Sequence, residues 1–113
     1  MDMISSTYMY DSNQSLSINI PCDEFHVASA EISKIPNENC WYFNRLIVPQ
    51  KFRNKGFATQ LLKALEVVAD NKKINIACDI NPYGDLDFNQ LHTLYAKFGF
   101  IDSTKYHMMR YCK

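Results

Sequence analysis

The period of the hydrophobic pattern changes near residue 50, and this change constrains the fold more than any other feature of the sequence. Upstream, residues 15–20 alternate polar and apolar side chains, and residues 40–48 are rich in aromatic and branched side chains. Both patterns are typical of β-strands. Downstream, apolar residues from Ala58 to Ala69 recur every three or four positions, which is the spacing of one helix face. The sequence therefore predicts strands first and an amphipathic helix after them.

Further elements follow the same two periods. The first helix is expected to stop at Asp70 and Asn71, and a second is expected over residues 87–98, where Asp87 and Gln90 have the spacing of a capping box. Its expected buried face comprises Phe88, Leu91, Leu94, Tyr95 and Phe98, with Gly99 closing the helix. Additional strands are expected at residues 7–10, 26–32, 74–80, 100–101 and 106–111. This order predicts one α/β (α+β) domain over residues 1–113, with a mixed sheet and two main helices.

Composition and charge argue against several classes of protein. No run of about 18 apolar residues is present, so no membrane span is expected, and residues 1–6 lack the pattern of a secretory leader. The formal net charge of the 113 residues is zero, which disfavours binding along a nucleic-acid backbone. Residues 45–73 nevertheless carry seven basic and two acidic side chains. This local excess favours a compact anionic ligand.

The cysteines and histidines lack the spacing of a metal site. The cysteines are Cys22, Cys40, Cys78 and Cys112, and the histidines are His26, His92 and His107. No Cys-x-x-Cys pair occurs, so we expect no metal and interpret the cysteines as reduced, mostly buried thiols of a cytoplasmic protein. Their even number leaves two disulfides open as the alternative.

The segment between the strand at 40–48 and the first helix carries a candidate anion site. A helix start has unpaired backbone N–H groups and a partial positive charge. Gly56 removes a side chain where a ligand would approach, and Asn54 tolerates the left-handed backbone that such a loop needs. Arg53 adds a positive charge beside them. The loop therefore suits a phosphate or pyrophosphate group, although an ordinary strand-to-helix turn with a basic surface has the same composition.

Two motifs in this half of the chain resemble those of one enzyme family. Arg53, Gly56 and Ala58 fit the pattern Arg/Gln-x-x-Gly-x-Gly/Ala, and residues 94–100 (LYAKFGF) fit Leu-Tyr-x-x-x-Gly-Phe. Together they resemble the GNAT superfamily of N-acetyltransferases, over about residues 40–111. The resemblance implies a mixed, mostly antiparallel sheet and the use of acetyl-coenzyme A as cosubstrate.

The resemblance also implies where the coenzyme lies. The strand at 40–48 would splay from the strand at 74–80, and the pantetheine would lie in the gap against backbone groups of Leu46, Ile47 and Val48. The pyrophosphate would be held by Arg53, Asn54, Lys55, Gly56, Phe57, Ala58 and Thr59. The family often has an asparagine one or two turns before the tyrosine; that position falls on Phe88 here, so Asn89, or Asn81 in the preceding loop, would substitute.

For the chemistry, the resemblance implies direct attack of an amine on the thioester. Tyr95 corresponds to the family's tyrosine near the thioester sulfur and would protonate the leaving thiolate, although a core aromatic is the alternative. Asp79 ranks first as the base that deprotonates the amine. The other candidates are Glu31, Asp85 and Asp87, and a surface charge or a helix cap is the alternative for each carboxylate. Cys78 as an acyl-carrying nucleophile is disfavoured against a small buried side chain.

The N-terminal half departs from the family pattern. Members usually carry one or two helices between the first strands, whereas residues 1–45 show no helical periodicity. The acceptor face would then be open, which suits a lysine or N-terminus on a protein surface; Tyr83 in the loop 81–86 is a candidate cover. Short phage-encoded members, including an anti-CRISPR type that modifies a lysine, look similar.

The sequence leaves three alternatives for function and assembly open. The first is a non-catalytic GNAT-like module that binds coenzyme A or a partner protein. The second is a small α+β nucleic-acid binder, which the zero net charge disfavours. A homodimer also remains open.

Overall fold

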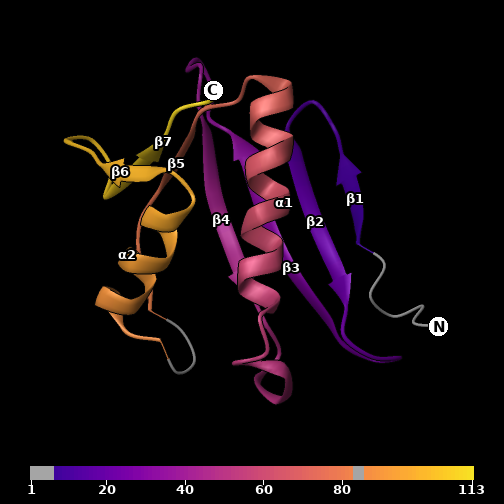
Figure 1. The fold of residues 1–113 in the computed structure, drawn as a ribbon. Helices are drawn as coiled ribbons and strands as arrows, with labels where there is room; N and C mark the ends of the chain where they lie inside the picture. Colours follow the sequence, from indigo (N-terminus) through magenta and orange to yellow (C-terminus); the bar gives the residue numbers. More distant parts are fainter. Residues whose placement is uncertain (1–6, 83–85) are drawn as a thin grey trace.

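The computed structural model describes residues 7–82 and 86–113, which form one seven-stranded sheet with two helices on it (Figure 1). The strand order is β1-β2-β3-β4-β5-β7-β6. The strands are β1 (Tyr8–Asp11), β2 (Ser15–Pro21), β3 (Val27–Lys34), β4 (Trp41–Ile47), β5 (Ile76–Cys78), β6 (Phe100–Asp102) and β7 (Met108–Arg110). All neighbours are antiparallel except β4 and β5, which are parallel. The predicted mixed, mostly antiparallel sheet with two main helices is confirmed.

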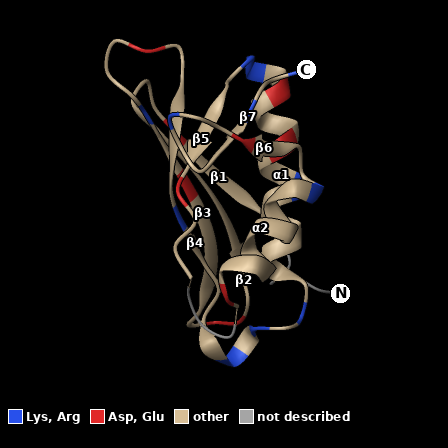
Figure 2. Ribbon diagram, turned by 90° about the vertical axis from the view of Figure 1, so that its left-hand side faces the viewer, with Lys and Arg blue, Asp and Glu red and all other residues tan. Residues whose placement is uncertain are grey.

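Both helices lie on the same face of the sheet (Figures 1 and 2). Helix α1 (Phe57–Lys72) buries Leu61, Leu62, Leu65 and Ala69, which belong to the predicted stripe. They pack with alternate residues of β2 and β3, such as Ile18 and Ala30, in the main core. Helix α2 (Phe88–Lys97) closes the same core with Leu91 and Tyr95. The other face of the sheet has no helix among the described residues. Both helices therefore cover only one face of the sheet.

The first helix ends later than its sequence predicts. Asp70 and Asn71 continue the helix, which ends at Lys72 and is closed by Lys73 in the left-handed conformation (φ 59°). Asp70 faces the buried Arg110 and accepts two hydrogen bonds from it, of 2.8 and 3.0 Å. The residue that suggested a helix stop is therefore a tertiary contact in the last turn. A short 3-10 turn, η1 (Gln50–Phe52), precedes α1 and was not predicted.

The second helix begins as predicted, but two residues of its expected buried face are not fully buried: Leu94 is half-buried and Phe88 is exposed. Asp87 and Gln90 form a reciprocal capping box, and Gly99 follows the helix with a φ of 94°. Phe88 was expected in the buried face, but it is 42% exposed. Its ring stacks on His92 instead. It lies in the first turn, beyond the edge of the core that Leu91 and Tyr95 reach.

Strand β4 separates from β5 after two residue pairs. Trp41 is paired with Ile76 and Tyr42 with Ala77, and β5 then ends at Cys78 while β4 continues to Ile47. Beside β3, the register of β4 shifts by one residue at this point, so Asn44 is a bulge. Strands β5 and β7 are shorter than the strands predicted at residues 74–80 and 106–111. The separation leaves a gap in the middle of the sheet.

All four cysteines are free thiols. Within residues 7–82 and 86–113, no helix is both long and apolar enough to cross a bilayer.

Candidate functional site

The loop into α1 forms an open helix start. Asn54 and Gly56 both adopt left-handed backbone conformations, with φ of 64° and 89°, as the sequence predicts for Asn54. Gly56 is the N-cap and provides no side chain, so the first-turn N–H groups receive no side-chain cap. A Cβ added at Gly56 would meet no atom within 4 Å. The helix start is therefore unfilled, as an anion site requires.

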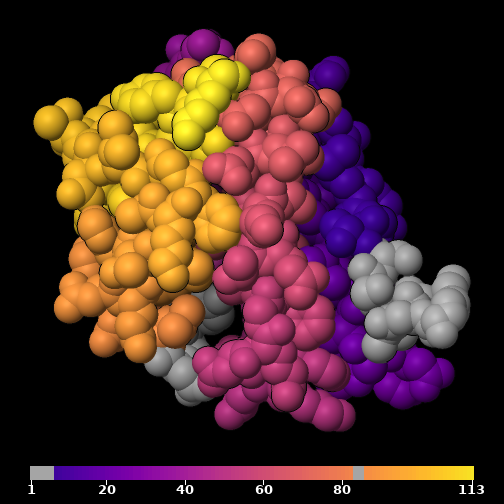
Figure 3. Space-filling view, in the orientation of Figure 1, coloured from indigo at the N-terminus to yellow at the C-terminus, as the bar shows by residue number. Residues whose placement is uncertain are grey.

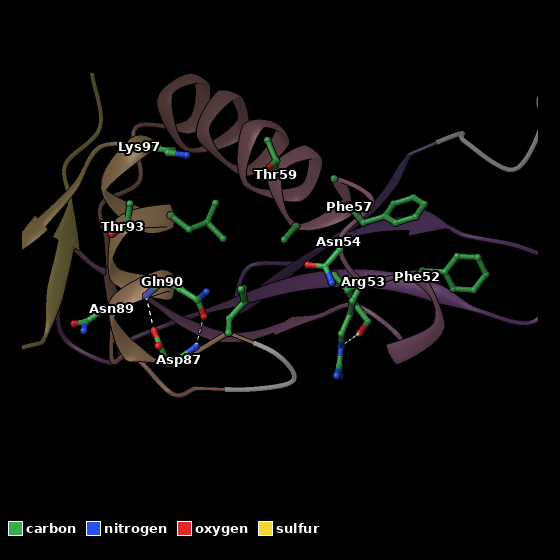
Figure 4. A pocket seen from close by; sticks show the side chains of 15 residues that line it. Phe52, Arg53, Asn54, Phe57, Thr59, Asp87, Asn89, Gln90, Thr93 and Lys97 are labelled. Carbon is green, nitrogen blue, oxygen red and sulfur yellow. Dashed lines mark hydrogen bonds between the residues drawn. The ribbon is translucent and has the colours of Figure 1, made fainter.

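A cavity of about 500 Å³ lies between this helix start and α2 (Figures 3 and 4). The segment from the end of β4 to the first turn of α1 contributes Val48, Phe52, Arg53, Asn54, Gly56, Phe57, Ala58 and Thr59. The α2 side contributes Leu86, Asp87, Asn89, Gln90, Thr93, Leu94 and Lys97. Most residues expected to bind the pyrophosphate thus line one cavity; Lys55 is exposed on the loop and is not among the lining residues. Asn89 lies at the cavity, but Figure 4 shows its amide turned away from α1.

A second cavity of about 370 Å³ occupies the gap between β4 and β5. It is lined by Phe43, Asn44, Arg45, Leu46, Ile47, Arg53, Cys78, Asp79, Asn81, Pro82 and Tyr95. Arg53 lines both cavities, and its Nε donates to the carbonyl of Val48 at 3.0 Å. The two cavities therefore meet at Arg53, where β4 ends and the loop into α1 begins.

Tyr95 and Asp79 both line the cavity between the strands. The Tyr95 ring is 6% exposed and packs between Phe43 and Phe100, with ring centroids 5.8 and 5.7 Å away. Asp79 directly follows β5. The structure thus brings together the two residues that the sequence assigned to catalysis, although the residues come from different parts of the chain.

Two residues beside Asp79 were missed by sequence reasoning. The Tyr42 hydroxyl donates to Asp79 Oδ2 at 2.9 Å, and His107 Nδ1 lies 3.2 Å from Asp79 Oδ1. Burial and the hydrogen bond to Asp79 raise the pKa of Tyr42, so the phenol stays protonated as a donor. Tyr42 pairs with Ala77 in the sheet, and Asp79 is two residues further along the chain, directly after the end of β5. Strand alternation would have indicated their shared face, but only after the pairing of β4 with β5 was known.

The other candidates take structural roles or lie apart from the cavity. Asp87 caps α2, and Glu31 is paired with Arg45 within the β3–β4 ladder. Burial raises the pKa of Cys78 to about 12, so its thiol is a poor nucleophile. Asp85 and Tyr83 lie outside the described residues. Within the part of the chain that is described, no group of three or more His, Cys, Asp or Glu side chains could hold a metal.

Comparisons with known proteins agree with this arrangement. Residues 21–102 match the acetyltransferase (GNAT) domain family. The crystal structure of the anti-CRISPR protein AcrVA5 has a similar fold, with a TM-score of 0.59 and 14% sequence identity over 91% of this chain and 95% of that one. No curated protein matches the sequence significantly. The family match spans β4, the loop into α1 and the motif around Tyr95, and it confirms the resemblance that the two motifs indicated.

Proposed function

Because the chain belongs to the GNAT acetyltransferase family, we propose that it is an N-acetyltransferase that moves the acetyl group of acetyl-coenzyme A to a primary amine. The family uses acetyl-coenzyme A as its cosubstrate. The observation that carries the proposal is the pair of cavities that meet at Arg53. One adjoins an open helix start that suits a pyrophosphate, and the other contains a phenol and a carboxylate.

Coenzyme binding is assigned to the chain's own backbone and basic groups. The N–H groups of Phe57, Ala58 and Thr59 would hold the pyrophosphate, because no side chain caps them and Gly56 leaves the space open. Arg53 adds a fixed positive charge at the junction of the cavities. The pantetheine would run along the backbone of residues 46–48 into the gap beside β5. Asn89 remains a candidate contact at the α2 side of the cavity.

The chemistry needs one proton removed and one supplied. The thioester provides an activated acetyl group, and the amine forms a C–N bond as the C–S bond breaks. Tyr95 is assigned to protonate the leaving thiolate, since a phenol has an ordinary pKa of about 10 and remains protonated at neutral pH. Asp79 is assigned to accept the proton of the amine. Both line the cavity between β4 and β5.

The acceptor is proposed to be an amine on a protein surface, either a lysine or an N-terminus. No described residue before Gln50 is helical, so the sheet face that carries Tyr42 and Asp79 lacks a helical cover there. Asp79 is 42% exposed. A small metabolite normally needs a pocket that encloses most of its surface, whereas a protein acceptor brings its own surface to an open site.

The proposal is tested by mass spectrometry of acceptors incubated with acetyl-coenzyme A. The acceptors are a lysine peptide with a blocked N-terminus, a lysine-free peptide with a free N-terminus, and polylysine. We expect a gain of one acetyl group on at least one of them and a loss of rate of about 10²-fold in Tyr95→Phe. Tyr95→Phe keeps the ring packed against Phe43 and Phe100, so the variant is expected to fold, which its melting temperature checks. Tight coenzyme binding by calorimetry with no acetylated product would support the non-catalytic module instead.

A further inference from the structure

The Asp79 carboxylate is held from two other elements of the fold. Tyr42, on β4, donates to Oδ2 at 2.9 Å. His107, immediately before β7, approaches Oδ1 with its Nδ1 at 3.2 Å. The two contacts use different oxygens, so the tyrosine fixes which oxygen faces the histidine. Asp79 lines the cavity between the strands, while His107 is not among its lining residues and is 56% exposed. The three side chains thus lead from the cavity toward solvent.

A backbone hydrogen bond indicates which ring nitrogen of His107 carries no proton. The N–H of Ile80 donates to His107 Nδ1 at 3.3 Å, and a ring nitrogen that accepts a hydrogen bond carries no proton. In this tautomer Nε2 carries the proton, and the single lone pair of Nδ1 accepts the hydrogen bond from the Ile80 N–H. This unprotonated nitrogen is the one beside Asp79, and it must release the Ile80 N–H before it can take a proton. The Phe88 ring packs edge-to-face against the imidazole from α2, with ring centroids 6.0 Å apart, and limits where the ring can turn.

We propose that His107 receives from Asp79 the proton that the acceptor amine loses, and passes it to solvent. The proposal rests on the acetyltransferase function proposed above. In the first step an N–H bond of the ammonium breaks and an O–H bond forms on Asp79. In the second step that O–H bond breaks, Nδ1 of His107 releases the hydrogen bond from the Ile80 N–H and forms an N–H bond in its place, and the resulting imidazolium loses a proton to water. His107 acts through Asp79 and is therefore a positioning residue of the site.

Acid strength explains why such a path is useful. An ordinary carboxyl has a pKa of about 4, an imidazole about 6.5 and a lysine ammonium about 10.4. A proton on the carboxyl would return readily to the amine, whereas transfer to an imidazole is downhill from the carboxyl. Tyr42 and Asp79 are the titratable groups in direct contact along this path, and Lys105 stands further out, over the ring of Tyr106. The path therefore removes the proton before the reverse transfer occurs.

The test compares His107→Asn with His92→Asn on the acceptor that the wild type acetylates. Asparagine keeps an amide near the Nδ1 position but relays no proton. His92 is the matched control, because it is also paired with an aspartate, Asp102, at 2.7 Å, and also contacts Phe88. Acetylated peptide is measured by mass, since imidazole itself consumes acetyl-coenzyme A. We expect His107→Asn to lower kcat about tenfold or more with little change in KM, and added imidazole to restore part of the lost rate.

Several outcomes would overturn the relay. An unchanged kcat in His107→Asn, a loss that appears only in KM, or a loss that imidazole does not rescue would each remove His107 from the proton path and leave the acetyltransferase proposal intact. If the wild type acetylates none of the acceptors, the proposed function fails and the relay fails with it. Should His107→Asn fold poorly, His107→Gln replaces it, and Asp79→Asn combined with the folded variant must then give no further loss beyond Asp79→Asn alone.

Discussion

At the scale of single residues, substitutions at two glycines distinguish an effect on coenzyme binding from an effect on stability. Gly56 and Gly99 both have positive φ, 89° and 94°. An added Cβ would meet open space at Gly56 but would lie 3.3 Å from Nε of Arg110 at Gly99. Both alanine variants adopt a strained backbone, at a cost of about 1–2 kcal/mol. Only at Gly56 does the new methyl group enter the proposed pyrophosphate site.

We therefore expect Gly56→Ala to weaken coenzyme A binding by about tenfold or more, because the methyl group keeps the ligand from the first-turn amides. Gly99→Ala is expected to lower the free energy of unfolding at least as much and to leave the dissociation constant unchanged. Titration calorimetry and urea denaturation measure the two quantities. Equal affinities in Gly56→Ala and the wild type would contradict the assignment of the loop.

The same scale shows which parts of the site were predictable. Residues 53–59 are contiguous, so their types and spacing predict a helix start with a left-handed approach, and the structure has both. The surroundings of Asp79 come from segments 37 and 28 positions away along the chain, at Tyr42 and His107. Tyr42 approaches through the parallel pairing of β4 with β5, and His107 through the antiparallel pairing of β5 with β7; no local pattern specifies either pairing. Phe88 was predicted to be buried and is exposed. Helical spacing assigns a residue to one face of the helix, but it does not show how far the core extends along that face.

At the scale of elements, Asp70 joins α1 to β7 and α2. Its carboxylate accepts hydrogen bonds of 2.8 and 3.0 Å from Arg110, whose side chain is 1% exposed. Arg110 Nε in turn donates to the carbonyl of Phe98, at the end of α2, at 2.7 Å. The hydrogen bonds from Arg110 lower the pKa of Asp70 from 3.8 to about 2. One buried guanidinium thus holds three elements in register.

Removing the Asp70 charge is expected to lower the free energy of unfolding by about 3 kcal/mol at pH 7, because the buried Arg110 loses the nearer of its two carboxylate partners and keeps only Glu66, at 3.5 Å. Because the folded state lowers the pKa of Asp70, its stabilising effect is complete well above pH 4 and is lost as the pH falls toward 2. The difference between wild type and Asp70→Asn in urea denaturation should therefore shrink over that range. Asp102→Asn, at a carboxylate that is 77% exposed, is the control and should cost less than about 1 kcal/mol. A difference that persists at pH 2 would contradict the pairing.

The element scale also explains the success and the limit of the fold prediction. Period-two and helical patterns identify β2, α1 and α2 because each buries one face against the same core. The three-residue strands β5, β6 and β7 are too short to define a period. The bulge at Asn44 depends on a register between β3 and β4 that shifts by one residue. The gap that contains the proposed reaction is thus a tertiary feature, and only the family resemblance predicted it.

At the scale of the whole molecule, the proposed coenzyme site joins three segments of the fold. Residues 46–48 end a central strand, residues 53–59 begin α1, and residues 86–97 form α2 and its entry. The cavity between α1 and α2 is open to solvent in Figure 3. A ligand that contacts all three segments would stabilise the fold as a unit rather than one loop.

Coenzyme A at 100 times its dissociation constant is expected to raise the free energy of unfolding by about 2.7 kcal/mol. Hydrogen exchange should show where the contacts form. Amides of residues 57–60 and 88–94 should gain protection, because they lie on opposite sides of the filled cavity. The protection of amides in β1 should change little, because β1 is an edge strand that exchanges by local fraying and lies away from the cavity. Protection confined to α2, with none in the first turn of α1, would mean that the ligand enters the cavity without its pyrophosphate at the helix start.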